Sequence, residues 1–253
     1  MGYGSLGDME ELPAYLEDIL GRAPSEALLR DAAQRYRLIG GRSPLLGALR
    51  EHAQALERET GCKVHVGMLH SEPRIRCALE TVLRRGHDAV LPLPACPFRG
   101  PYEGKAEAPG LRRLEAPDWH AHPLLVQAFR ENLREPGDVV LFTAHGLPRR
   151  EPLYESDFQD LASAVAGAAG VREWRLAYQG SGMGQALEEA AREGAGSVTL
   201  CPLGYLCECL ETLYDCDILY KGIAERLGLR FERTPPPDPV PCWADVVRKG
   251  LAP

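Results

Sequence analysis

The fold is decided by the stretch Leu141-Phe142-Thr143-Ala144-His145-Gly146-Leu147-Pro148, in which an apolar run leads directly into a histidine and is then stopped by Gly and Pro. A run of this kind is typical of a buried parallel strand. The carboxyl ends of such strands are where open α/β sheets place their ligand crevices. A second strand of the same type, Ser197 to Pro202, leads toward Glu211. We therefore expect His145 and Glu211 to face each other across a cleft.

The composition limits the class of protein. The chain has 253 residues, 45% of them hydrophobic, which is enough for a sizeable core. Its formal net charge is -7 and its basic residues are dispersed, which argues against nucleic acid as the main partner. It has no run of eighteen apolar residues, and it opens on a Gly-rich, acidic stretch rather than a signal sequence. We expect a cytoplasmic protein without stable membrane insertion.

The eight cysteines lack the regular spacing of a disulfide framework, so reduced thiols are expected. Four of them, Cys201, Cys207, Cys209 and Cys216, lie within sixteen residues of one another. They contain no Cys-x-x-Cys pair, and the first lies in a predicted strand, so we do not expect an iron-sulfur cluster. Buried, unpaired cysteine is the interpretation we favour.

Strands alternate with helices along most of the chain, and this alternation predicts parallel sheets with helices on both faces. Helices are expected at Glu11 to Leu20, Ser25 to Leu38, Pro44 to Thr60, Glu72 to Arg85, Asp157 to Ala168, Gly184 to Arg192, Cys207 to Leu227 and Trp243 to Leu251. Strands are expected at Lys63 to Met68, Asp88 to Leu93, Asp138 to Thr143, Glu173 to Tyr178 and Ser197 to Pro202.

The predicted fold is α/β, with two Rossmann-like lobes that each contain a parallel four-stranded sheet flanked by helices. We place the amino-terminal lobe at 1–122, the carboxyl-terminal lobe at 123–233, and a Pro-rich strap with a terminal helix at 234–253. The chain opens on Met1-Gly2-Tyr3-Gly4, which is typical of the turn after a first strand. Either such a strand precedes the sequence given, or the fold does without it.

Three acidic or imidazole side chains are candidates for chemistry. A histidine after a strand is more often structural than functional, but the rigid turn made by Gly146 and Pro148 holds His145 at the crevice. Glu211 has apolar neighbours, which would raise its pKa toward neutrality. Asp215 lies four residues further on, so the two carboxylates repel each other unless a cation, a proton or water separates them. A weakly bound Fe²⁺ or Zn²⁺ would fit an imidazole and carboxylates.

Several segments, in order, resemble the ferrochelatase family, and within it the bacterial branch that uses coproporphyrin. The matching segments are Gly2-Tyr3-Gly4; Arg35-Tyr36 with Ile39-Gly40-Gly41-Arg42-Ser43-Pro44-Leu45; Gly67-Met68-Leu69-His70-Ser71-Glu72-Pro73; Thr143-Ala144-His145-Gly146-Leu147-Pro148; and Pro202-Leu203-Gly204-Tyr205 with Leu210-Glu211-Thr212-Leu213-Tyr214-Asp215. The resemblance implies insertion of Fe²⁺ into a porphyrin held between two Rossmann-like lobes.

In the family the histidine and glutamate of these motifs face each other over the macrocycle, so the resemblance assigns catalysis to His145 and Glu211. The family tyrosine of the amino-terminal turn corresponds to Tyr3, which would approach the metal from the opposite face and accompanies use of coproporphyrin III. Metal contacts are expected at His145, Glu211 and Asp215, the last one turn along the metal's route. For the porphyrin propionates our candidates are Arg42 and Ser43, because guanidinium pairs with carboxylate bidentately.

The sequence also departs from the family. The region after Gln179 and the loop 95–100 are shorter than their family counterparts. Two other functions therefore stay open. One is a sirohydrochlorin cobalt or nickel chelatase, against which the lack of a His-rich tract argues; the other is a non-catalytic haem or porphyrin carrier. The expected partners are coproporphyrin III or protoporphyrin IX, with Fe²⁺ as substrate and no permanent cofactor, and the expected state is a monomer.

Overall fold

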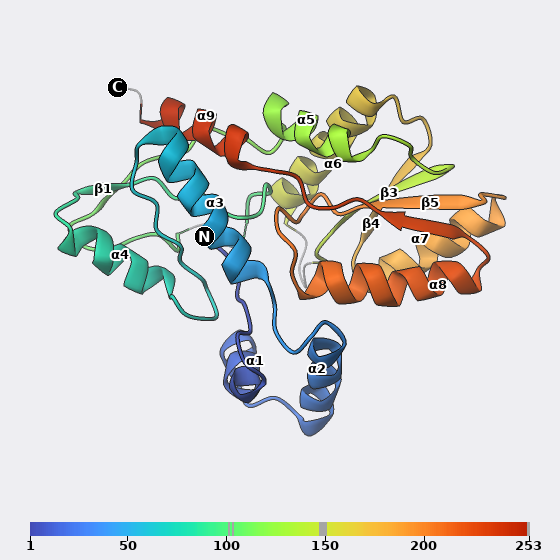
Figure 1. The fold of residues 1–253 in the computed structure, drawn as a ribbon, viewed down its shortest axis with the longest axis horizontal. Helices are drawn as coiled ribbons and strands as arrows, with labels where there is room; N and C mark the ends of the chain where they lie inside the picture. Colours follow the sequence, from blue (N-terminus) through green and yellow to red (C-terminus); the bar gives the residue numbers. More distant parts are fainter. Residues whose placement is uncertain (101, 103, 147–150, 252–253) are drawn as a thin grey trace.

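The carboxyl-terminal part of the chain is built on a parallel sheet of four strands in the order β4-β3-β5-β6. The computed structural model describes residues 1–100, 102, 104–146 and 151–251 (Figure 1). The strands are β3 (Val139–Ala144), β4 (Trp174–Tyr178), β5 (Ser197–Cys201) and β6 (Arg230–Arg233). Every residue of β3 is buried, as expected for a central strand that is covered on both faces.

Helices cover both faces of this sheet. Because side chains alternate along a strand, Val140 and Phe142 enter one hydrophobic core while Val139 and Leu141 enter another. The first core includes residues of α5 (Pro123–Asn132), α6 (Pro152–Ala169) and α9 (Val240–Gly250). The second includes residues of α7 (Ser181–Arg192), of the π-helix η2 (Glu211–Tyr220) and of α8 (Lys221–Arg226).

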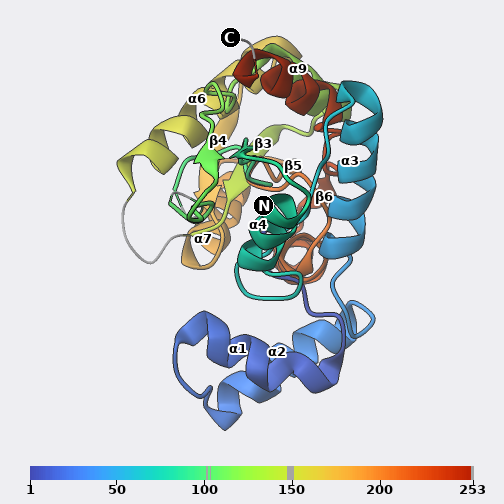
Figure 2. The ribbon, with the colours of Figure 1, turned by 90° about the vertical axis from the view of Figure 1, so that its left-hand side faces the viewer.

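The amino-terminal part is mostly helical. It contains η1 (Met9–Glu11), α1 (Leu12–Leu20), α2 (Glu26–Leu38), α3 (Leu45–Thr60), α4 (Ile75–Arg84), β1 (Ala89–Val90) and β2 (Arg112–Arg113). The Ser25 side chain caps α2 by accepting a hydrogen bond from the Leu28 amide, so the predicted helix begins one residue later, at Glu26. Helix α3 packs against α9, whereas α1 and α2 project from the body as a pair (Figures 1 and 2).

The predicted α/β fold with parallel sheets flanked by helices is confirmed, but the prediction of a four-stranded sheet in each lobe is wrong. Within the described ranges the amino-terminal part has a single sheet, the parallel pair β1-β2. The predicted strand Lys63 to Met68 is reduced to bridges from Met68 to Gly2 and Arg74. The predicted strand Asp88 to Leu93 is reduced to β1. A strand needs a hydrogen-bonded neighbour, and the facing edges of these segments border a cavity instead. The division of the chain after residues 122 and 233 stays a prediction.

The structure also differs from the predicted helix Cys207 to Leu227. Most of this stretch forms the π-helix η2, which continues into the α-helix α8. Helix α4 begins at Ile75 rather than Glu72, since main-chain hydrogen bonds from Met68 to Pro73 and from Ile75 to Met68 hold this stretch extended. The sequence did not predict α5 or β6. Among the described helices, none has the length and apolar character needed to span a membrane.

Candidate functional site

A cavity of about 320 Å³ brings together Tyr3, Ser43, His145 and Glu211, which come from four distant parts of the sequence. The remaining lining residues are Gly2, Gly4, Tyr15, Tyr36, Leu45, Ala95, Cys96, Tyr102, Tyr154, Gly204, Tyr205, Leu206, Cys207, Cys209 and Leu210. The two other predicted site residues, Arg42 and Asp215, do not line it within the described part of the chain. The cavity is thus formed by the loops at the ends of β3 and β5 together with the amino-terminal turn and helices α1 and α2.

His145 is positioned by the end of the central strand. It directly follows β3, its side chain is exposed, and its carbonyl accepts a hydrogen bond of 3.1 Å from the Tyr154 hydroxyl. Gly146 allows the next turn to pass close to β4, because a Cβ at this position would lie 2.7 Å from the Gln179 carbonyl oxygen. The predicted turn continues through Leu147 and Pro148, which lie outside the described residues. The imidazole is therefore presented at the cavity by a backbone that packs against the neighbouring strand.

Glu211 begins the π-helix η2 and is surrounded by phenol groups. Its charge contributes to raising the pKa of five tyrosines, with burial as the largest cause at each: Tyr3, Tyr15, Tyr36, Tyr102 and Tyr205. These phenols are protonated at neutral pH and can donate hydrogen bonds. A carboxylate within a wall of phenol rings can accept a proton beside a flat, apolar ligand.

Tyr3 lies at the mouth of the cavity and is supported from behind by an ionic cluster. Its side chain is 42% exposed, and its ring lies 4.6 Å from the ring of His70, centroid to centroid. Nδ1 of His70 lies 2.7 Å from a carboxylate oxygen of Asp18. Asp18 also accepts two hydrogen bonds of 2.9 Å from Arg74, which hold its pKa below the usual range. Asp18, in α1, thus connects that helix to the stretch 70–74, whose His70 ring lies against Tyr3.

Asp215 lies one turn beyond Glu211, where it faces α2 rather than the cavity. One of its oxygens lies 3.6 Å from the Arg35 guanidinium, which also pairs with Asp31 and sits over the Tyr214 ring. Burial first, and then the charge of Glu211, raise the pKa of Asp215 to about 6. The predicted repulsion between the two acids is therefore present, and the Arg35 guanidinium lies beside the Asp215 carboxylate. The role of Asp215 as a metal ligand stays a prediction.

Ser43 and Arg42 have different surroundings. Ser43 lines the cavity and its carbonyl accepts a hydrogen bond from the Ser5 hydroxyl. Arg42 is exposed and, among the residues that the structure describes, makes no ion pair. The propionate contacts proposed for both residues are untested, but an unpaired guanidinium next to a cavity-lining serine is available for a carboxylate.

The four clustered cysteines do not gather around one point at the cavity. Cys207 and Cys209 line it, whereas Cys216 is joined to Gln179 and Cys201 lies within β5. Burial raises the pKa of Cys201 and Cys207 to about 12. Within the described ranges, no group of three or more His, Cys, Asp or Glu side chains could hold a metal ion.

The sequence did not predict the tyrosine wall of the cavity. Its members other than Tyr3 are Tyr15 in α1, Tyr36 in α2, Tyr102 in a loop, Tyr154 in α6 and Tyr205 in the turn after β5. The Tyr205 hydroxyl donates a hydrogen bond of 2.5 Å to Gln179, which links this wall to the end of β4. Two of the wall's members, Tyr36 and Tyr205, belong to the motifs quoted above, and this was the available signal. The other three stand alone in the sequence.

The protein has an α/β fold and a cavity that is lined by aromatic rings. The cavity also contains an imidazole that follows β3 and a carboxylate at the start of η2, an arrangement typical of an enzyme active site. The sequence model of the ferrochelatase family matches residues 7–251. The chain belongs to the ferrochelatase family, so the expected class of enzyme, a metal-inserting lyase, is confirmed.

Curated relatives agree with this assignment. The chain is 28% identical to coproporphyrin III ferrochelatase of Halalkalibacterium halodurans, over 100% of this chain and 96% of that protein. It is 27% identical to coproporphyrin III ferrochelatase of Listeria monocytogenes, over 98% of this chain and 94% of that protein.

Solved structures support the fold alone. SirB from Bacillus subtilis with Fe³⁺ has a TM-score of 0.63 at 14% identity, covering 81% of this chain and 90% of SirB. CbiX, described as the terminal enzyme for biosynthesis of siroheme in denitrifying bacteria, has a TM-score of 0.55 at 20% identity, covering 83% of this chain and 93% of CbiX.

Proposed function

We propose that this protein inserts Fe²⁺ into coproporphyrin III to form coproheme III. The observation that carries the proposal is the single cavity in which His145, Glu211 and Tyr3 meet. The relatives named above, which match almost the whole chain, support the choice of metal and ring. The tyrosine in the amino-terminal turn supports coproporphyrin over protoporphyrin, by the family resemblance.

Metal insertion requires that two pyrrole N–H protons leave the ring. His145 and Glu211 supply the imidazole and the carboxylate of the cavity, the two kinds of side chain that serve as general bases; His145 directly follows β3 and Glu211 begins η2. The phenol wall offers ring faces for a flat macrocycle and hydrogen-bond donors at its edge. Arg42 and Ser43 would pair with propionates where the cavity opens, which leaves the centre of the macrocycle to the imidazole and the carboxylate.

Fe²⁺ is a substrate in this proposal, and no permanent cofactor is involved. The cysteines at the cavity favour this view, because the raised pKa of Cys209 and of Cys207 keeps both sulfurs as thiols, which are poor metal ligands. A weak, incomplete ligand set suits an ion that is passed on rather than kept. The cytoplasmic location and the monomeric state expected from the sequence form part of the same proposal.

The test is an anaerobic insertion assay with the purified full chain, in which Fe²⁺ is offered with coproporphyrin III, protoporphyrin IX or sirohydrochlorin in parallel. Insertion is followed by the change of the Soret band. We expect turnover with coproporphyrin III to exceed turnover with the other two rings. Binding of coproporphyrin without insertion would instead support a carrier, and insertion into sirohydrochlorin alone would support the other class of chelatase.

A further inference from the structure

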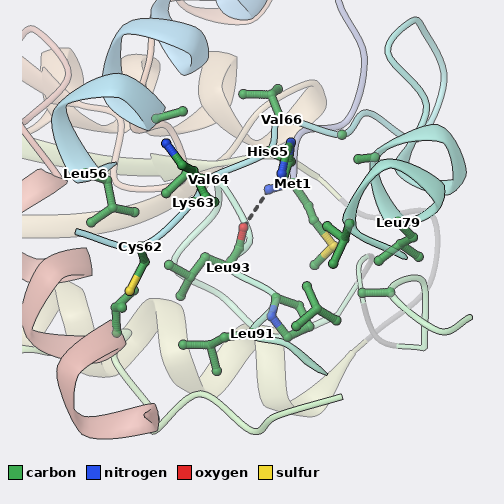
Figure 3. A pocket seen from close by; sticks show the side chains of 18 of the residues that line it. Met1, Leu56, Cys62, Lys63, Val64, His65, Val66, Leu79, Leu91 and Leu93 are labelled. Carbon is green, nitrogen blue, oxygen red and sulfur yellow. Dashed lines mark hydrogen bonds between the residues drawn. The ribbon is translucent and has the colours of Figure 1, made fainter. Parts of the chain in front are cut away.

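The loop 95–100 contributes two residues, Ala95 and Cys96, to the lining of the cavity proposed as the catalytic site. It begins beside a second cavity, of about 470 Å³, where main-chain hydrogen bonds hold it. There the Leu93 carbonyl accepts a hydrogen bond of 2.6 Å from the Met1 ammonium group (Figure 3). The later residues of the loop are held in a different way, by side chains of α6.

Arg99 binds a fully buried carboxylate on α6. The Asp157 side chain has no exposed surface, and its Oδ2 accepts hydrogen bonds of 2.9 Å from the Arg99 amide and 3.0 Å from Nε. Its Oδ1 accepts a hydrogen bond of 2.5 Å from Nη2 of the same guanidinium. One residue of the loop thus binds both oxygens, through main chain and side chain together, which fixes the loop in one position on the helix.

This ion pair fixes geometry more than it adds stability. Burying the charge of Asp157 costs free energy that the attraction to Arg99 must offset, so two apolar side chains of similar volume often stabilise a protein as well. Apolar contacts have little directional preference, whereas the hydrogen bonds of a guanidinium fork have defined angles. A buried ion pair at this place therefore orients the loop and the first turns of α6 relative to each other.

Phe98 makes a second contact between the loop and α6. Its buried ring meets the Tyr154 ring edge-on at 5.1 Å between centroids, and it lies 5.4 Å from the Phe158 ring. Asp157 and Phe158 lie three and four residues after Tyr154, so all three share one face of the helix. The loop therefore contacts that face through an aromatic ring and a guanidinium.

The same face of α6 reaches the end of the central strand. The Tyr154 hydroxyl donates a hydrogen bond of 3.1 Å to the His145 carbonyl. The Phe158 ring packs edge-on against Tyr178 of β4, which pairs with Ala144 of β3. A shift of α6 would thus move the backbone from which the imidazole projects.

A second segment of the chain supports the ion pair from outside. Nδ1 of His120 lies 2.6 Å from a carboxylate oxygen of Asp118 and 3.6 Å from Oδ1 of Asp157. The other oxygen of Asp118 lies 3.6 Å from Nη1 of Arg99. Because these contacts are longer than those of the guanidinium to Asp157, Arg99 is the principal partner of the buried carboxylate.

From these contacts we infer that Arg99 and Asp157 are positioning residues for His145. They lock the loop 95–100 onto α6, and α6 holds the His145 carbonyl through the Tyr154 hydroxyl. Neither charged residue belongs to the described lining of the cavity. The effect on catalysis rests on the proposed function, whereas the effect on the surroundings of the His145 ring does not.

Three variants of the full chain test the inference. Arg99→Lys keeps the charge but loses the fork, Tyr154→Phe loses only the hydroxyl, and the third variant combines both. In the insertion assay with Fe²⁺ and coproporphyrin III, we expect each single substitution to lower kcat by about tenfold and to change KM for the porphyrin by less than about threefold. We expect the double variant to be no slower than the slower single variant, because both substitutions break the same series of contacts.

Two matched controls change similar groups elsewhere. Arg175→Lys alters an ion pair between β4 and α7, and Tyr220→Phe removes another buried hydroxyl, which accepts a hydrogen bond from the Gly180 amide. Both controls should insert iron at the wild-type rate. If Arg99→Lys does not fold, Arg99→Met combined with Asp157→Leu takes its place with the same expected results, because it leaves no unpaired buried charge.

A measurement without substrate separates this inference from the proposed function. The Cε1–H signal of His145 in the NMR spectrum, identified by its loss in His145→Ala, should shift in Arg99→Lys and in Tyr154→Phe but not in the controls. An unshifted signal in Arg99→Lys would overturn the inference, and so would independent losses of kcat that multiply in the double variant. If both signals shift but the wild type inserts no metal, the inference stands and the proposed function is wrong.

Discussion

The substitution Asp215→Asn should stabilise the protein at neutral pH, although it removes a partner of Arg35. The Asp215 side chain is only 16% exposed, and its pKa of about 6 lies above the usual value of 3.8 for an aspartate. A carboxyl group with a raised pKa is less stable as an anion in the folded state than in the unfolded state. Asparagine has the same shape and no charge to desolvate, and it does not repel Glu211.

The pKa values set the size and the pH range of the effect. A rise from 3.8 to about 6 corresponds to about 3 kcal/mol at neutral pH. This figure already includes the attraction between Asp215 and Arg35, which lowers the pKa, and we expect a rise in Tm of roughly 5 °C or more. As the pH falls from about 6 toward 3.8, the folded protein takes up the proton first, so the wild type regains stability and the difference disappears.

Thermal unfolding of the wild type and the variant, measured above pH 6 and again near pH 3.8, checks both statements. The matched control is Asp31→Asn, which removes the other acidic partner of Arg35. The Asp31 side chain is 53% exposed, so its loss should change Tm little. The reasoning fails if Asp215→Asn is less stable than the wild type at neutral pH, or if the two substitutions have the same effect.

Three further substitutions test the site. His145→Ala should abolish metal insertion while fluorescence quenching still reports porphyrin binding, and normal turnover would exclude His145 from the mechanism. Glu211→Gln should lower the insertion rate by about 100-fold or more and change its pH profile, whereas an unchanged profile would assign proton transfer to another group. Gly146→Ala would place a Cβ 2.7 Å from the Gln179 carbonyl and should cost about 1–3 kcal/mol of stability as well as activity. Its control, Gly184→Ala, has open space in α7 and should be neutral or stabilising in the same unfolding assay.

The parts of the fold that local sequence determines were predictable. β3 and β5 are short apolar runs that end at Gly or Pro signals, so their burial follows from their own residues. The positions of His145 and Glu211 follow from the same runs, because parallel strands bring their carboxyl ends to one edge of the sheet. The structure places both residues in the lining of one cavity.

Features that depend on distant partners were not predictable. β6 carries three charged residues and is an edge strand, so it lacks the apolar alternation that indicates a strand. The stretch Lys63 to Met68 has the composition of a strand, but within the described residues its only β-bridges are those of Met68. The phenol wall around Glu211 is assembled from separate elements, and no spacing in the sequence relates Tyr15 to Tyr102.

Tyr3 and His145 follow main-chain positions with similar hydrogen bonds. The Gly2 carbonyl accepts a hydrogen bond from the Leu69 amide, as the Ala144 carbonyl accepts one from the Gln179 amide. Each side chain follows a residue whose carbonyl closes a parallel pairing, Gly2 in one part and Ala144 in the other. The two parts therefore present one side chain each to the same cavity from equivalent backbone positions. The phenol of Tyr3, whose pKa is raised by burial, keeps its proton at neutral pH, whereas an imidazole ring offers a nitrogen lone pair that can take up a proton. Tyr3 and His145 thus follow two similar turns at the same cavity, and one side chain is a phenol while the other is an imidazole.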